Sequence, residues 1–247
     1  MHRSFSILPF ALSLAFALGA CTGDDGSKTG SGDTRAIDSA QLAPPLAGSP
    51  ADTAAMRDTV PSQPVATHTA VISTSAGDIE VELYGLDAPK TVANFVGLAR
   101  KNFYNGILFH RVIPGFVIQG GDPLSKDPSK RDSWGSGGES IYSDEFEDEL
   151  NADSPSGRRG YTEGTLAMAN AGPSTNSSQF FIILSAAGGR QLTYNYTIFG
   201  AVRKGMEAVR GIEQTGTGGE KPANPASITK VTVTDLPAAA QMPKTNS

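Results

Sequence analysis

A fixed cation lies inside an apolar run of the sequence. The stretch FHRVIPGFVIQGGD, residues 109–122, places Arg111 among aliphatic and aromatic side chains. A buried guanidinium costs several kcal/mol unless it is paired or faces a cleft that a ligand fills. Alternate side chains of an extended chain share one face, so Arg111 and Gln119 are expected on the same side of the break at Pro114–Gly115. That break is expected to kink the strand and turn Phe116 to the same face, which suits a peptide-binding groove better than a core.

A second stretch, GTLAMANAGPSTNSSQFFIIL at residues 164–184, has the same order of apolar strand, polar turn and apolar strand. Taken alone, each of its polar or aromatic residues has an ordinary structural interpretation. Asn170 reads as a turn former, Gln179 as a hydrogen-bonding residue at a strand edge, and Phe181 as part of the core.

Composition excludes several kinds of chemistry. The chain has one cysteine and three histidines, so a disulfide, a cysteine-cluster metal site and zinc chemistry are not expected. Lysine and arginine total 20 against 25 aspartate and glutamate, with no basic run, which argues against a nucleic-acid partner. We therefore predict neither a metal nor a cofactor.

Short apolar segments separated by glycine-rich turns dominate the middle of the chain. Segments 71–75 and 78–83 predict a β-hairpin around Ala76–Gly77, and a helix is expected to open at Pro89. Its apolar stripe repeats at helical spacing: Val92, Phe95, Val96 and Ala99. Further strands are predicted at 165–169, 179–184, 197–202 and 228–234, and a second helix from Met206, Val209 and Ile212. Many short strands with two helices favour a closed or sandwiched antiparallel sheet.

The two ends of the chain differ in composition from its middle part. Residues 1–21 have a basic residue, an apolar stretch and the ending Leu-Gly-Ala-Cys, which resembles the lipobox of a bacterial lipoprotein signal peptide with Cys21 as the lipidation site. Residues 22–68 predict a disordered Gly/Ser/Pro/Ala-rich linker, and residues 237–247 a flexible tail. We expect a cell-envelope protein, held at the membrane through lipidated Cys21. Because Thr22 and not Asp follows, the expected anchor is the outer membrane, facing the periplasm.

Together the motifs FHRVIPGFVIQGGD, SIYSDEFEDE, GTLAMANAGPSTNSSQFFI and TIFG resemble the cyclophilin family of peptidyl-prolyl cis-trans isomerases. The likeness covers residues 69–236. It implies a mainly β domain, a closed eight-stranded antiparallel β-barrel with two capping helices, and isomerase activity on proline-containing polypeptide substrates. We expect it to act as a monomer.

The resemblance also implies roles for single residues. Arg111 falls on the catalytic position, Gln179 on one that holds the arginine in place, and His110 on a structural one. The proline pocket falls on Phe116, Val117, Phe181 and Leu192, and the contacts to the substrate backbone on Gln119, Ala169 and Asn170.

Three positions depart from the family pattern. Gln191–Leu192 replaces a common tryptophan–leucine pair, and residues 185–190 include a short insertion, so the pocket rim is altered. Tyr196 stands where histidine is common and is expected to change substrate preference. The missing tryptophan implies low affinity for cyclosporin-type ligands.

Two other functions compete with the isomerase. One is a non-catalytic or weakly catalytic proline-peptide binding or chaperone module. The other is a hydrolase that uses the acidic run at 144–149, because paired carboxylates can act as acid and base. We interpret that run as a solvated loop face instead.

Overall fold

The alternating apolar segments form one antiparallel sheet of eight strands in this computed structural model, which describes residues 61–216 and 219–237. The order across the sheet is β3-β4-β6-β5-β7-β2-β1-β8. The strands are β1 (His68–Thr74), β2 (Gly77–Leu83), β3 (Arg111–Ile113), β4 (Val117–Gly120), β5 (Thr165–Met168), β6 (Phe180–Ile183), β7 (Ile198–Lys204) and β8 (Ile228–Asp235). The mainly β prediction is confirmed, and β1 and β2 form the predicted hairpin.

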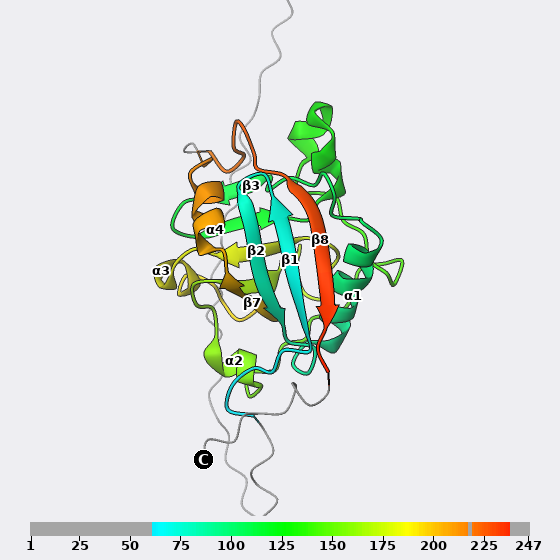
Figure 1. Cartoon of the computed structure of the whole chain (residues 1–247), viewed down its shortest axis with the longest axis vertical. Helices are drawn as coiled ribbons and strands as arrows, with labels where there is room; N and C mark the ends of the chain where they lie inside the picture. The colour runs from blue at the N-terminus through cyan, green and yellow to red at the C-terminus, as the bar shows by residue number, and fades with distance from the viewer. Residues whose placement is uncertain (1–60, 217–218, 238–247) are drawn as a thin grey trace, which may run out of the picture. The chain divides into compact units, whose positions relative to one another are not determined.

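The sheet curls until its two edges meet. Beside the outer strands, Gly106 N–H donates to the Ile228 carbonyl at 2.7 Å, and Ile228 N–H donates to the Ile107 carbonyl at 2.7 Å. Phe109 N–H also donates to the Ala226 carbonyl at 2.9 Å. The join therefore uses the chain just before β3 and the start of β8. In Figure 1, β2, β1 and β8 form the front layer and the other strands cross behind them.

Two helices flank this front layer, as the sequence predicts. They are α1 (Pro89–Arg100) and α4 (Met206–Glu213), which lie on opposite sides of β1, β2 and β8 in Figure 1. The apolar stripe of α1 is buried, and so are Val209 and Ile212 of α4. Both helices thus cover the core with the face that their periodicity indicates.

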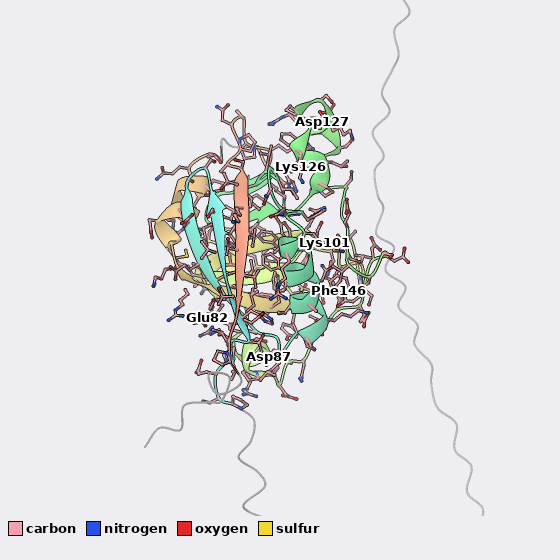
Figure 2. The ribbon with its side chains drawn as sticks, turned by 45° about the vertical axis from the view of Figure 1, so that its right-hand side comes forward. Glu82, Asp87, Lys101, Lys126, Asp127 and Phe146 are labelled. Carbon is pink, nitrogen blue, oxygen red and sulfur yellow. The ribbon has the colours of Figure 1, made fainter. Side chains whose placement is uncertain are left out.

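Four shorter helical segments are not predicted from the sequence. They are η1 (Pro123–Lys126), η2 (Pro128–Ser133), α2 (Pro155–Arg159) and α3 (Ala186–Gly189). Each starts after a residue whose side chain accepts a hydrogen bond from a backbone N–H of its first turn: Asp122, Asp127, Ser154 and Ser185. With four to six residues each, they are too short for a helical repeat to show. Figure 2 shows Lys126 and Asp127 on the turns that stand at one end of the sheet.

The packed chain begins before residue 69, the start of the predicted domain. Val65 and Thr67 are buried, Thr67 N–H donates to the Leu83 carbonyl at 2.9 Å, and His68 already belongs to β1. The predicted signal peptide, the predicted lipidation site Cys21, the predicted linker up to residue 60 and the predicted tail from residue 238 lie outside the described residues. Within residues 61–216 and 219–237, no helix is both long enough and apolar enough to cross a membrane.

Candidate functional site

Three central strands divide their side chains between two apolar clusters. Leu166, Met168, Phe180 and Ile182 point into the main core. Their neighbours Ala167, Phe181 and Ile183, with Val117 of β4, form a second cluster on the opposite face. This division follows from the two-residue period of a strand. The residues that could read as core from the sequence therefore belong to two faces, and only one of them faces the interior of the barrel.

A row of paired residues crosses the second face. In the strand register, Arg111 of β3 is opposite Gln119 of β4, Gln119 is opposite Phe181 of β6, and Phe181 is opposite Ala167 of β5. Directly opposed residues have neighbouring side chains. The sheet thus brings a cation, an amide and an aromatic ring into one line, although Phe181 is far from Arg111 and Gln119 in the sequence.

One small cavity collects the predicted pocket residues. Its volume is about 170 Å³, and it is lined by Arg111, Phe116, Val117, Gln119, Ala169, Asn170, Phe181, Leu192 and Tyr196. Among the residues predicted to act on substrate, only Gln179 is missing from this lining. The cavity has aromatic and aliphatic walls with a guanidinium and two amides at its edge, a composition that suits a small apolar ring attached to a polar backbone.

Arg111 is held from two sides. Its Nη1 donates to Gln119 Oε1 at 3.2 Å, while Nε and Nη2 donate to the carboxylate of Glu220 at 2.9 and 3.2 Å. The Arg111 side chain is 31% exposed and that of Glu220 is 62% exposed. The hydrogen bond from Arg111 holds the pKa of Glu220 below its ordinary value, so this carboxylate is charged at neutral pH. Arg111 is therefore neither an isolated buried charge nor free in solvent.

Gln179 reaches Arg111 only through an intermediate residue, Gln119. No hydrogen bond joins it to Arg111; instead its Oε1 accepts from Gln119 Nε2 at 2.9 Å. Its own amide donates to the carbonyls of Gly135 and Gly137 at 3.0 and 2.6 Å. The chain of contacts runs from a fixed loop through Gln179 and Gln119 to the guanidinium, so Gln179 can hold the arginine only through Gln119.

Tyr161 supports the aromatic wall and is missed by sequence reasoning. Its hydroxyl donates to the Tyr196 carbonyl at 2.7 Å and accepts from Tyr196 N–H at 2.9 Å. Tyr196 in turn packs edge-on against Phe181, with ring centroids 5.5 Å apart. Burial raises the pKa of Tyr161 to about 12, so its hydroxyl stays protonated and keeps both contacts. It stands in an irregular segment, where no periodicity in the sequence marks it.

Residues 185–190, where the sequence predicts an altered pocket rim, contain the short helix α3. Gly188 N–H bonds to Ser185 Oγ at 2.9 Å, and Leu192 N–H bonds to the Gly189 carbonyl at 3.1 Å. Leu192 lines the cavity and Gln191 is exposed. This segment therefore folds into a capped turn that places Leu192 in the lining of the cavity.

The acidic run at 144–149 is only partly the solvated face that we expected from the sequence. Phe146 is buried and, as Figure 2 shows, lies beside α1. Glu149 accepts the N–H groups of Lys90 and Thr91 at 3.0 and 2.8 Å, which caps the first turn of α1. Asp148 binds Asn176 Nδ2 at 2.7 Å. These two carboxylates are engaged in structural contacts, which weakens the hydrolase alternative.

Asn170 is also tied to the loops around it. Its Nδ2 donates to the Asn195 carbonyl at 2.8 Å and contacts Asp148 Oδ1 at 3.4 Å. Among the described residues, its side-chain carbonyl and its backbone N–H and C=O have no hydrogen-bond partner, so these groups can bind a ligand. Beyond Asn170 the cavity adjoins a larger hollow of about 650 Å³ that shares Gln119, Ala169 and Asn170 with it. An extended peptide could therefore continue past the small pocket.

His110 does not line the 170 Å³ cavity. It is 1% exposed, neither ring nitrogen has a hydrogen-bond partner among the described residues, and burial lowers its pKa to about 4. It lines a different hollow behind Arg111, of about 270 Å³. A neutral, buried imidazole at this place fits the structural role expected from the sequence. Within the described residues, no three His, Cys, Asp or Glu side chains gather to hold a metal ion.

The family model that matches this chain and two of its relatives carry the same enzyme description. The family model described as cyclophilin type peptidyl-prolyl cis-trans isomerase/CLD matches residues 69–233. The chain is 42% identical over 195 residues to peptidyl-prolyl cis-trans isomerase A of Mycobacterium tuberculosis, covering 71% of this chain and 97% of the relative. It is 45% identical over 161 residues to a peptidyl-prolyl cis-trans isomerase of Schizosaccharomyces pombe, covering 64% and 94%.

A solved structure shares the architecture. The crystal structure of a Cryptosporidium parvum cyclophilin type peptidyl-prolyl cis-trans isomerase superposes with a TM-score of 0.59 at 35% sequence identity, over 69% of this chain and 99% of that one. The same protein was also crystallised in the presence of the dipeptide Ala-Pro, and that structure matches equally well.

Proposed function

This chain belongs to the cyclophilin-type peptidyl-prolyl cis-trans isomerases, and from that premise we propose that it accelerates X-Pro isomerisation during the folding of cell-envelope proteins while anchored through lipidated Cys21. One observation carries the assignment of the site. The residues that the family motifs predict for arginine, proline pocket and backbone contacts line one cavity of about 170 Å³.

The reaction needs no nucleophile. An X-Pro amide crosses a barrier of about 18 to 20 kcal/mol because twisting breaks the resonance of its C–N bond. In the twisted state the nitrogen gains electron density, and a guanidinium that is always charged can donate to it at the edge of a water-poor pocket. Arg111 has that place in the cavity lining.

The other cavity residues would position the substrate. Phe116, Phe181 and Leu192 would hold the proline ring while the preceding carbonyl swings, and Gln119 and Asn170 would bind the backbone. The C. parvum relative crystallised with Ala-Pro present supports a proline-containing ligand for this pocket. Tyr196 closes one side through its contact with Phe181.

The test is Arg111→Ala in an assay of proline-limited refolding and of X-Pro peptide isomerisation. We expect kcat/KM to fall by about 10²- to 10³-fold, as when one charge-stabilising donor is lost, while the thermal unfolding curve stays close to that of the wild type. Wild-type turnover in the variant would disprove the catalytic assignment. Turnover on a short peptide by the wild type also separates an enzyme from a simple proline-peptide binding module.

The anchor is tested separately. We expect the wild type, expressed in a bacterium, to partition into the detergent phase and Cys21→Ser into the aqueous phase, because the only thiol that could carry the lipid is lost. Isomerase activity should be equal in both. Equal partitioning of the two proteins would contradict lipid attachment at Cys21, and fractionation of the two membranes tests the outer-membrane location.

A further inference from the structure

The segment that carries Glu220 is fixed against β3. Val112 N–H donates to the Glu220 carbonyl at 2.8 Å. The next residue, Lys221, is hydrogen-bonded to η2 in both directions. Its Nζ donates to the carbonyls of Arg131 and Asp132 at 2.8 and 3.0 Å. Arg131 Nη2 donates to the Lys221 carbonyl at 3.0 Å. The backbone is thus held at Glu220 and directly after it, and the carboxylate is presented from a defined position.

The contact between Glu220 and Arg111 has a geometry that defines orientation. Two N–H groups on one edge of the guanidinium meet the two oxygens of one carboxylate, at 2.9 and 3.2 Å. Such a side-on pair fixes the plane of the guanidinium as well as its position. Together with Gln119, it engages three of the five N–H groups that an arginine carries, and the other two have no partner among the described residues.

We propose that Glu220 is a positioning residue for catalysis, whose carboxylate holds Arg111 so that its two remaining N–H groups face the proline pocket. The proposal rests on the proposed function, because it needs Arg111 as the catalytic cation. Glu220 does not line the 170 Å³ cavity, so it acts on the substrate only through Arg111.

Loss of the carboxylate should therefore affect turnover more than binding. The Arg111 side chain is long and 31% exposed, and without its partner it gains alternative rotamers in which the guanidinium leaves the pocket. The apolar walls that hold the proline ring are unchanged. A carboxylate that only neutralised the arginine would instead restrain catalysis, and its removal would raise the rate.

The experiment measures kcat and KM of the full chain on an X-Pro peptide for Glu220→Gln and Glu220→Asp. We expect Glu220→Gln to lower kcat about tenfold, the order of one charge-assisted hydrogen bond, with KM within about twofold of the wild type. Glu220→Asp keeps the carboxylate and should recover most of the loss. An unchanged or increased kcat in Glu220→Gln would overturn the proposal.

A matched control comes from another arginine–glutamate pair. Glu163 pairs with Arg210, and its side chain is 49% exposed, similar to Glu220. Glu163→Gln removes the same charge from the surface but should leave kcat and KM at wild-type values. A loss equal to that of Glu220→Gln would show a general effect of surface charge and contradict the proposal.

A double variant separates positioning from a purely structural role. In the Arg111→Ala background, Glu220→Gln should cause no further loss of the residual rate, because the group it positions is gone. Independent losses that multiply would place the effect in the loop and overturn the proposal. If Arg111→Ala alone keeps full turnover, the proposed function of the site fails; if it is inactive while Glu220→Gln is normal, only the role of Glu220 fails.

Discussion

Two adjacent phenylalanines of β6 lie on opposite faces of the sheet and belong to different apolar clusters. Phe180 is fully buried and packs against Phe95 and Tyr104 with ring centroids 5.7 and 5.8 Å apart. Phe181, one residue later, packs against Tyr196 and lines the cavity that we propose as the proline pocket. The same strand therefore supplies the core with one side chain and the candidate active site with the next. In this sheet, the alternation of side chains along a strand decides whether a residue packs in the core or lines the cavity. The residue type decides less, since both residues are phenylalanine.

The largest expected effect is on the inner face. Phe180→Ala leaves a closed cavity among aromatic rings of the core, and we expect the free energy of unfolding to fall by about 3 to 5 kcal/mol. Urea or thermal unfolding measures this loss. At temperatures where the variant remains folded, its kcat/KM should stay near the wild-type value. A stable Phe180→Ala protein with impaired catalysis would contradict the division between the two faces.

The outer face should show the reverse pattern. Phe181→Ala removes a wall of the pocket and the edge-on contact with Tyr196, so we expect KM to rise and kcat/KM to fall by roughly 10- to 100-fold, the equivalent of about 1.5 to 3 kcal/mol of lost apolar contact. The loss of stability should be smaller than in Phe180→Ala, because the space opens onto the pocket and water can fill it. Unchanged peptide kinetics would remove Phe181 from the site.

Sequence patterns predict the parts of this structure that are periodic or belong to long motifs. The β1–β2 hairpin, α1 and α4 follow from spacing alone, and the residues of the proline cavity follow from the resemblance. The alternation of side chains along a strand also predicts that Arg111 and Gln119 share one face, and the pairing of β3 with β4 confirms it.

The remaining contacts depend on long-range packing that the sequence does not encode locally. Glu220 reaches Arg111 from 109 residues away, and Glu149 caps α1 from 59 residues away. Tyr161 supports Tyr196 from an irregular segment. Gln179 lies beside Gln119, and its hydrogen bond to Gln119 in place of Arg111 depends on side-chain geometry. Such pairings arise only when the sheet has closed.

A second pair of neighbours, His110 and Arg111, extends the comparison to pH. Burial lowers the pKa of His110 from 6.5 to about 4, with Arg111 and Lys221 adding to the effect and Asp122 opposing it. Below pH 6.5 the unfolded chain therefore binds a proton that the folded chain does not. The contribution of His110 to stability is complete above pH 6.5 and is lost as the pH falls toward 4.

We expect this group to remove about 1 to 2 kcal/mol of stability between pH 7.5 and pH 5. Urea unfolding at both pH values measures it, and His110→Gln, which cannot titrate, is the matched variant. The difference between the two pH values should be smaller in His110→Gln. An equal difference in both proteins would show that other groups cause the acid sensitivity.

The smallest expected effects come from two carboxylates of the acidic run, residues 144–149. They test whether this run contributes to stability or to the candidate active site. Glu149→Ala removes the acceptor of the Lys90 and Thr91 N–H groups at the start of α1, and we expect a loss of about 1 kcal/mol, as for other helix caps. Glu147→Ala, which removes an exposed carboxylate paired with the Lys90 ammonium, should cost only a few tenths of a kcal/mol. Isomerase kinetics should be unchanged in both, since neither residue lines the proline cavity. A fall in kcat with Glu149→Ala at unchanged stability would move this carboxylate from helix capping to catalysis, and would show that the acids of this segment serve the outer face after all.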